Sequence, residues 1–260
     1  MGVSESINPF THQYLEQELK FYGLTKPYRF GDLKLVFFTP HLRCDDFLNV
    51  SMHLEKPTIP MLIVNGIPWM SLTWSEVQSH VLPIRKAEGD VGIIGSGLGY
   101  YTLSVMKKEE VNTVTVFEID PHIVWFFQRH FKDRPGYEKV RFVIGDALKT
   151  CRDYDFDLLY NDRYETGLPD ETLTDIHHFQ QYNRIYHYHP WSLELCYLLC
   201  WIDELMDPIY FPDDITDLFT EWMCTDDSNL KPPFSDSKFA LQVVEAMAEY
   251  EYKSFQGKSL

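Results

Sequence analysis

The order of parts between Asp90 and Asp162 constrains the fold of this chain more than any other feature. An apolar run of strand length, Asp90–Ile94, ends in a glycine-rich turn (Gly95-Ser96-Gly97-Leu98-Gly99), and a segment of helical composition follows. A strand, a glycine turn and a helix form the first half of a βαβ unit, whose parallel strands are buried on both faces. The pattern therefore predicts an α/β fold built on a parallel sheet.

Two further apolar runs each end beside a carboxylate. Thr113–Ile119 carries Glu118 near its end, 19 residues after Gly99, and Val140–Ile144 runs into Gly145-Asp146-Ala147. An acid in the first of these places can accept hydrogen bonds from both hydroxyls of a ribose, and glycines let a ligand approach the backbone. The order of parts predicts a nucleoside pocket. The alternative is that both acids only cap the ends of strands.

The spacing of the glycines distinguishes two kinds of nucleoside ligand. A dinucleotide site has the fingerprint G-x-G-x-x-G/A, whereas this chain carries Tyr100 at the last position. A bulky side chain there would obstruct the close contact between helix and strand that the third glycine allows. The sequence therefore disfavours NAD as the ligand.

The segment from Asp90 to Glu165 resembles the class I S-adenosylmethionine-dependent methyltransferases. In that superfamily the sheet is Rossmann-like, doubly wound and mostly parallel, and the acid after the third strand reaches the adenine amino group. The resemblance implies S-adenosylmethionine as the cofactor. The cofactor-binding residues that it implies are Gly95, Gly97, Gly99, Glu118, Ile119, Asp146, Ala147 and Asn161.

The residues before the glycine turn narrow the resemblance. Asn65–Ser71 and Trp74–His80 look like a remote version of the stretch that precedes the glycine loop in spermidine synthases, which often carry a β-rich N-terminal domain. Phe30–Phe38 and Pro60–Val64 have the apolar and β-branched composition of strands in such a domain. Asn161-Asp162 falls where aminopropyltransferases place the first acid of their D-S-S-D motif.

Two departures from the spermidine synthase pattern favour methyl transfer. Aminopropyltransferases carry an acid inside a G-G-G-D-G-G loop, where this chain has Leu98, and the D-S-S-D motif is replaced by Asp162-Arg163-Tyr164-Glu165. The missing loop acid argues against decarboxylated S-adenosylmethionine. An aminopropyltransferase stays open as one alternative, and a catalytically inactive nucleoside-binding or interaction protein as another.

The chemistry of methyl transfer asks little of the protein. The sulfonium is a strong electrophile, so the enzyme mainly aligns a nucleophile with the methyl group, and a carboxylate can hold or remove the nucleophile's proton. Asp162 is the first candidate for that role, with Tyr164 and Glu165 as shaping or secondary groups. Asn161–Tyr164 also matches in part the N-P-P-Y motif of amino-methyltransferases of DNA, RNA or protein, although both prolines are absent.

Charge and composition bear on the partners. The net charge of −16 disfavours a nucleic-acid substrate, which leaves a small molecule or a protein side chain as acceptor. The chain shows no membrane-length apolar run and no secretory signal pattern. Its five cysteines are odd in number and lack zinc spacing, so a cytoplasmic enzyme without a metal is expected. A homodimer is compatible with these features.

Three regions follow from these patterns. Residues 1–80 are expected to form a β-rich N-terminal region, 81–165 the Rossmann-like cofactor-binding core, and 166–260 a mainly helical C-terminal region. In the last region Leu173–Tyr188 and Trp191–Met206 have the composition of helices. No strand is recognisable after the fourth, so either the sheet is truncated or its last strands are disguised.

Overall fold

The computed structural model of the protein describes residues 12–39, 44–45, 51–52, 58–163 and 171–191. The chain divides into two compact units, Met1–Val81 with Gln242–Leu260, and Leu82–Leu241. Among the described residues, no helix has the length and apolar character that a membrane span requires.

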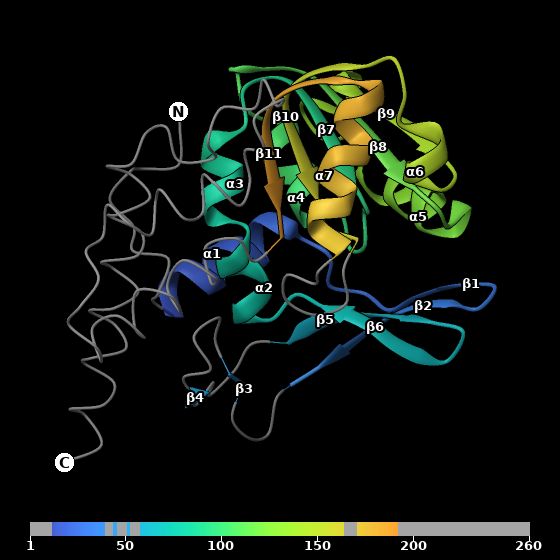
Figure 1. The fold of residues 1–260 in the computed structure, drawn as a ribbon. Coiled ribbons are helices and arrows are strands. Elements are labelled where there is room, and N and C mark those ends of the chain that lie inside the picture. The colour runs from blue at the N-terminus through green and yellow to red at the C-terminus, as the bar shows by residue number, and fades with distance from the viewer. Residues whose placement is uncertain (1–11, 40–43, 46–50, 53–57, 164–170, 192–260) are drawn as a thin grey trace, which may run out of the picture. The chain divides into compact units, whose positions relative to one another are not determined.

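The first unit contains an antiparallel sheet in the order β1-β2-β5-β6 (Figure 1). The turn between β5 and β6 is Asn65-Gly66, with φ angles of 52° and 80°, as a two-residue hairpin of the primed type requires. The sheet confirms the strands predicted in the N-terminal region. The strands of this unit are β1 (Tyr28–Phe30), β2 (Leu33–Phe38), β5 (Ile59–Val64) and β6 (Ile67–Ser71), with a short separate pair, β3 (Cys44–Asp45) and β4 (Ser51–Met52).

Two helices accompany this sheet within the first unit. Helix α1 (His12–Tyr22) buries Leu15 and Tyr22, and α2 (Trp74–Ser79) buries Trp74 and Val77. The helix α2 begins after Thr73, whose hydroxyl oxygen accepts the N–H of Glu76 at 3.4 Å. Such a cap satisfies one of the backbone donors that a helix start leaves unpaired.

The second unit is built on five parallel strands in the order β9-β8-β7-β10-β11 (Figure 1). Numbered along the chain, this order is 3-2-1-4-5, the arrangement of a doubly wound Rossmann-like sheet. The parallel sheet and the antiparallel N-terminal sheet confirm the predicted fold class. The strands are β7 (Gly89–Ile94), β8 (Val111–Glu118), β9 (Val140–Ile144), β10 (Asp155–Asn161) and β11 (Arg184–Pro190).

Helices connect these strands and cover the sheet. Helix α4 is buried along its whole length, and α7 lies across the face of the sheet that Figure 1 turns toward the viewer. Helix α5 begins with Asp120, whose carboxylate accepts the N–H of His122 at 2.8 Å, and with Pro121 in its first turn. The helices are α3 (Val81–Lys86), α4 (Tyr100–Met106), α5 (Pro121–Phe131), the 3-10 helix η1 (Tyr137–Lys139), α6 (Ala147–Thr150) and α7 (Glu171–Tyr182).

The fifth strand corrects the prediction of a single helix over Leu173–Tyr188. Helix α7 ends at Tyr182, and β11 then pairs in parallel with β10. Asn183 makes the break, because its side-chain oxygen accepts the N–H of Tyr154 at 3.0 Å and its amide donates to the carbonyl of Cys151 at 2.9 Å. Of the two alternatives for the end of the sheet, β11 is therefore a strand that its sequence disguises. Residues 192–260, with most of the predicted helix Trp191–Met206, lie outside the described residues.

Candidate functional site

The segments that the sequence singles out meet at one edge of the parallel sheet. The glycine loop follows β7, Glu118 ends β8, Gly145-Asp146 follows β9, and Asp162 follows β10. The strand order reverses between β7 and β10, which lie side by side. Open α/β sheets bind ligands outside the carboxyl ends of their strands at such a reversal. The structure thus gathers these residues at the edge where this type of fold binds ligands.

Close packing of the backbone explains two of the loop glycines. Gly95 has a φ of 85°, and a Cβ added there would lie 2.5 Å from the carbonyl oxygen of Asp162. Gly99 has a φ of 77°, and a Cβ there would collide with the ring of Phe127 on α5. The close contact between the glycine loop and helix α5 therefore occurs at Gly99. Tyr100, which stands at the place of the third glycine of a dinucleotide fingerprint, is buried.

Glu118 holds the glycine loop in place. One carboxylate oxygen accepts the N–H of Ser96 at 2.8 Å, and the other accepts the N–H of Asp120 at 2.9 Å. The residue is only 5% exposed, and burial raises the pKa of its carboxyl, while the backbone donors lower it in part. The backbone N–H of Ile119 is a further hydrogen-bond donor to this carboxylate. A carboxylate offers about four acceptor positions, so some capacity remains for a ligand such as a ribose.

An apolar surface lies next to Glu118. Ile119 is 70% exposed after the end of β8, and Ile144, which pairs with Glu118 across the sheet, is 55% exposed at the end of β9. Ala147 follows in the first turn of α6 and is buried. Large exposed apolar side chains at the end of a buried sheet suit a flat heteroaromatic ring. The roles of Ile119 and Ala147 in cofactor binding stay predictions.

Asp146 caps α6. One carboxylate oxygen accepts the N–H of Leu148 at 3.1 Å, and the other lies 3.0 Å from the ammonium of Lys149. The hydrogen bond from Lys149 keeps the pKa of the Asp146 carboxyl below its ordinary value. Because Lys149 is 79% exposed, its ion pair is weak and Asp146 can exchange this partner for a ligand. Asp146 therefore has a capping role at the start of a helix, and its contact with adenine stays a prediction.

Asn161 and Asp162, at the end of β10, contact different parts of the structure. Asp162 follows the strand, and its N–H donates to the carbonyl of Ile94 at 2.9 Å, which continues the ladder with β7. Asn161 is fully buried, and its amide donates to the hydroxyl of Tyr188 at 2.6 Å. The prediction that Asn161 contacts the cofactor therefore stays a prediction. Tyr164 and Glu165 lie outside the described residues.

Sequence reasoning missed Asp175, a buried acid on α7 that is only 3% exposed. Its two carboxylate oxygens accept hydrogen bonds from Arg163, one from Nε at 2.6 Å and one from Nη2 at 2.7 Å. Nε and Nη2 form the planar fork that pairs bidentately with a carboxylate. A lone acid in a helix has no spacing motif that would connect it to β10, so the sequence offered no signal for this pair.

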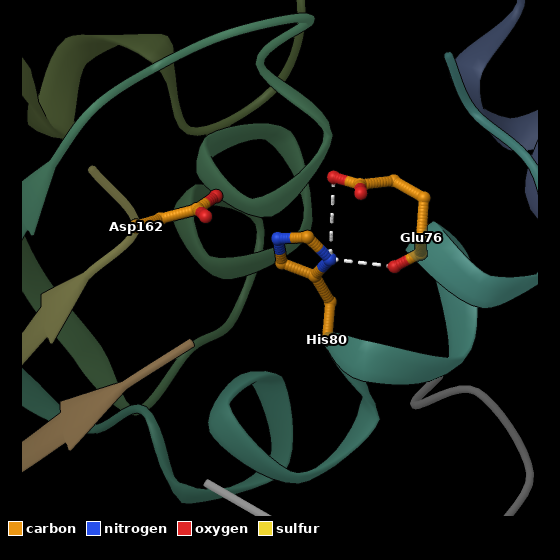
Figure 2. Close-up of side chains that lie close together, drawn as sticks. All are labelled: Glu76, His80 and Asp162. Atoms are coloured by element: carbon orange, nitrogen blue, oxygen red, sulfur yellow. Dashed lines mark hydrogen bonds and ion pairs between the residues drawn. The ribbon is translucent and has the colours of Figure 1, made fainter. Parts of the chain in front are cut away.

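In the N-terminal unit, the stretch that resembles the spermidine synthase motif forms α2 and its end. The Nδ1 atom of His80 lies 2.6 Å from the carbonyl oxygen of Glu76 and 3.8 Å from its carboxylate (Figure 2). His80 is buried, at 2% exposed. Within this unit the ring of His80 is therefore held by the preceding turn of its own helix.

Comparison with protein families agrees with this geometry. The model of the spermine/spermidine synthase domain matches residues 75–187, less than half of the 260-residue chain. This stretch includes the glycine loop, Glu118, Asp146 and Asp162. The chain resembles the spermidine synthases. This resemblance and the Rossmann-like order of the parallel sheet agree with the class I methyltransferase type of fold that the motifs predict.

Solved structures with a partial likeness to this chain include two spermidine synthases. A spermidine synthase from Thermotoga maritima is 15% identical over 61% of this chain and 53% of its own, with a TM-score of 0.39. A spermidine synthase in complex with the transition state analogue AdoDATO is 15% identical over 61% and 52%, with a TM-score of 0.38. A DhpI-SAM-HEP complex is 21% identical over 41% and 45%, with a TM-score of 0.31. The chain spans about half the length of each structure, and no curated protein sequence matches it.

Proposed function

We propose that this protein is a transferase that binds S-adenosylmethionine at the carboxyl ends of β7–β10 and moves its methyl group to a small molecule or a protein side chain. One observation carries the proposal. The buried carboxylate of Glu118 is fixed on the glycine loop by the N–H of Ser96, with acceptor positions left over for a ribose. A preorganised acceptor loses little freedom when the ligand binds.

The choice of S-adenosylmethionine over its decarboxylated form depends on the glycine loop. Leu98 is fully buried there, at the place where aminopropyltransferases carry an acid. An acid in the loop would attract the ammonium of the decarboxylated form and repel the carboxylate of S-adenosylmethionine itself. An apolar residue removes that repulsion, which supports the carboxylated cofactor.

Asp162 is the proposed group for orienting or deprotonating the acceptor. It stands directly after β10, beside Gly95 of the glycine loop. A carboxylate at this place can accept the proton that an amine or hydroxyl nucleophile loses as it attacks the methyl carbon. The bond from sulfur to the methyl carbon breaks as the new bond forms, and the sulfonium leaves as the neutral thioether S-adenosylhomocysteine.

Aminopropyl transfer is the second candidate function. The spermine/spermidine synthase domain model matches the stretch that contains both the glycine loop and Asp162, which favours this reaction. In that case the bond from sulfur to the aminopropyl carbon would break, and the product nucleoside would be methylthioadenosine. The two reactions therefore differ in the nucleoside that they release.

Mass spectrometry of the product nucleoside separates the two candidates. The purified full chain is incubated with S-adenosylmethionine or with its decarboxylated form, in each case with a mixture of amine, hydroxyl and peptide acceptors. We expect S-adenosylhomocysteine, formed only with S-adenosylmethionine. Methylthioadenosine formed with the decarboxylated cofactor and an amine would select aminopropyl transfer instead, and no product nucleoside with either cofactor would contradict both.

A further inference from the structure

We propose that Arg163 and Asp175 form an ion-pair lock whose task is to position Asp162 for group transfer. This proposal rests on the proposed function of the site, because it assigns a task to two residues that support Asp162. The lock is the ion pair between Arg163 and the Asp175 carboxylate on α7. Asn161, on the other side of Asp162 in sequence, donates to the same carboxylate. The lock is built entirely within the unit that carries the parallel sheet.

Both neighbours of Asp162 are held by one carboxylate. Arg163 donates to Asp175 through Nε at 2.6 Å and through Nη2 at 2.7 Å, and the amide of Asn161 donates to the same carboxylate at 3.3 Å. In an extended chain the side chains of residues i−1 and i+1 point to one side, and that of residue i points to the other. Because Asp175 holds both neighbours, the side chain of Asp162 is directed away from α7.

The backbone of Asp162 is held as well. Its N–H donates to the carbonyl of Ile94 at 2.9 Å, and its own carbonyl packs so closely on Gly95 that no side chain fits between them. Asn161 also donates to the hydroxyl of Tyr188 on β11 at 2.6 Å, which joins a third element to the lock. Asp162 is thus fixed by β7, α7 and β11 in the place where the glycine loop begins.

The burial of Asp175 makes the lock a strong constraint. At 3% exposed, its carboxylate needs compensation by a positive charge, and removing one partner of such a pair leaves an uncompensated buried charge. A second Arg–Asp pair, Arg184 with Asp155, lies at the other end of β10, where the side chains are 68% and 52% exposed. That pair joins the same two residue types between the neighbouring strands β10 and β11, but it is exposed to solvent. It therefore serves as the matched control for the buried pair.

Amide hydrogen exchange tests whether the lock holds Asp162. In Arg163→Gln and in Asp175→Asn we expect the N–H of Asp162 to exchange at least about tenfold faster, relative to the buried Leu158 amide of the same strand. The control Arg184→Gln is expected to leave this ratio unchanged. A ratio that stays at the wild-type value in both lock variants, in chains with native circular dichroism, would overturn the proposal.

Turnover tests whether the lock acts through Asp162. At saturating S-adenosylmethionine, we expect product formation to fall by about 10- to 100-fold in Asp175→Asn, because a misplacement of about 1 Å has effects of that order. The dissociation constant for S-adenosylmethionine should change less than about twofold. In the double variant with Asp162→Asn, the rate should equal that of Asp162→Asn alone.

Two other outcomes have distinct meanings. Losses that multiply in the double variant, or a loss of cofactor affinity equal to the loss of rate, would overturn the positioning role and leave a merely structural pair. If the wild-type chain forms no product nucleoside, the proposed transfer function fails, and hydrogen exchange then still decides whether Arg163 and Asp175 hold Asp162.

Discussion

At the scale of single residues, Glu118 has two tasks that compete for one carboxylate. It accepts the N–H groups of Ser96 and Asp120, which shapes the glycine loop, and in the proposed function it also accepts the hydroxyls of a ribose. Burial raises its pKa because the charged form loses water, whereas backbone donors and a ligand both favour the charged form. In the proposed function the site therefore uses a carboxylate whose charged form is disfavoured by burial and favoured by its backbone donors.

The first prediction concerns the affinity for S-adenosylmethionine. In Glu118→Gln one acceptor oxygen is replaced by an NH₂ group and the charge is lost. Charge-assisted hydrogen bonds contribute roughly 1.5–3 kcal/mol each, so calorimetry should show at least about a tenfold weaker affinity. Glu109→Gln, an exposed position before β8, is the control and should bind like the wild type. Unchanged affinity in Glu118→Gln would refute the assignment to the ribose.

The second prediction concerns pH and follows from the direction of the Glu118 shift. In the folded state the pKa of the Glu118 carboxyl is raised above its ordinary value of 4.5. Between pH 4.5 and that raised pKa, the folded protein therefore binds more protons than the unfolded chain. The free energy of unfolding should therefore contain a contribution from Glu118 that falls as the pH rises from about 4.5 through the raised pKa. In Glu118→Gln this contribution should vanish from a series of urea denaturations.

Cofactor affinity should follow the opposite course over the same interval, because only the ionised carboxylate accepts from two hydroxyls. Asp146 does not interfere with this measurement. The pKa of its carboxyl is lowered from 3.8, so it titrates at a lower pH than Glu118, whose pKa is raised from 4.5. An affinity for S-adenosylmethionine that is flat across the pH range in which Glu118 titrates would contradict the account.

At the scale of elements, the glycine loop and α4 show where local sequence reasoning succeeds and fails. The order of strand, glycine turn and acid was predictable, because Gly95 and Gly99 occupy left-handed backbone positions that close neighbours keep free of a Cβ. Strand β11 was not predictable in the same way. Its residues Tyr186 to Tyr188 continue the aromatic composition of α7, and only the side chain of Asn183 and pairing with β10 separate helix from strand.

Helix α4 holds a buried hydroxyl group that lowers stability, and the third prediction concerns this group. It is buried on all sides, and among the described residues the hydroxyl of Thr102 has no hydrogen-bond partner. A buried polar group without a partner costs about 1–3 kcal/mol. Thr102→Val keeps the shape and removes the hydroxyl, so we expect the free energy of unfolding to rise by about 1 kcal/mol in urea denaturation.

A matched position on β8 provides the control for this change. Thr113 is a threonine whose hydroxyl donates to the Asp90 carboxylate at 2.7 Å. Thr113→Val should lower the free energy of unfolding by about 1 kcal/mol, since the hydrogen bond is lost. If both variants lose stability to the same extent, the hydroxyl of Thr102 is not an unsatisfied group.

At the scale of the whole molecule, topology explains why the sequence could predict that these segments gather at one end of the sheet. Residues at the carboxyl ends of parallel strands meet at one edge, so motifs far apart in the chain become neighbours once the strand order is known. The Arg163–Asp175 pair was not visible, because a contact between a loop and a later helix depends on how α7 crosses the sheet. Periodicity in the sequence contains no information about that crossing.

The fourth prediction follows from the charge of the whole chain. With a net charge of −16, binding to duplex DNA would lack the basic side chains that neutralise phosphates and release counterions. We expect no gel shift at physiological salt with micromolar protein. A submicromolar affinity that falls steeply with salt would overturn this, and would favour an amino-methyltransferase acting through the segment Asn161–Tyr164.

A calorimetric titration of the full chain with S-adenosylmethionine, beside one with its decarboxylated form, tests the central claim most directly. The account predicts binding of S-adenosylmethionine with one site, and an affinity at least about tenfold higher than that for the decarboxylated form, because Leu98 replaces the acid of the glycine loop. Tighter binding of the decarboxylated form would contradict the choice of cofactor. Absence of binding by both would contradict the nucleoside site itself.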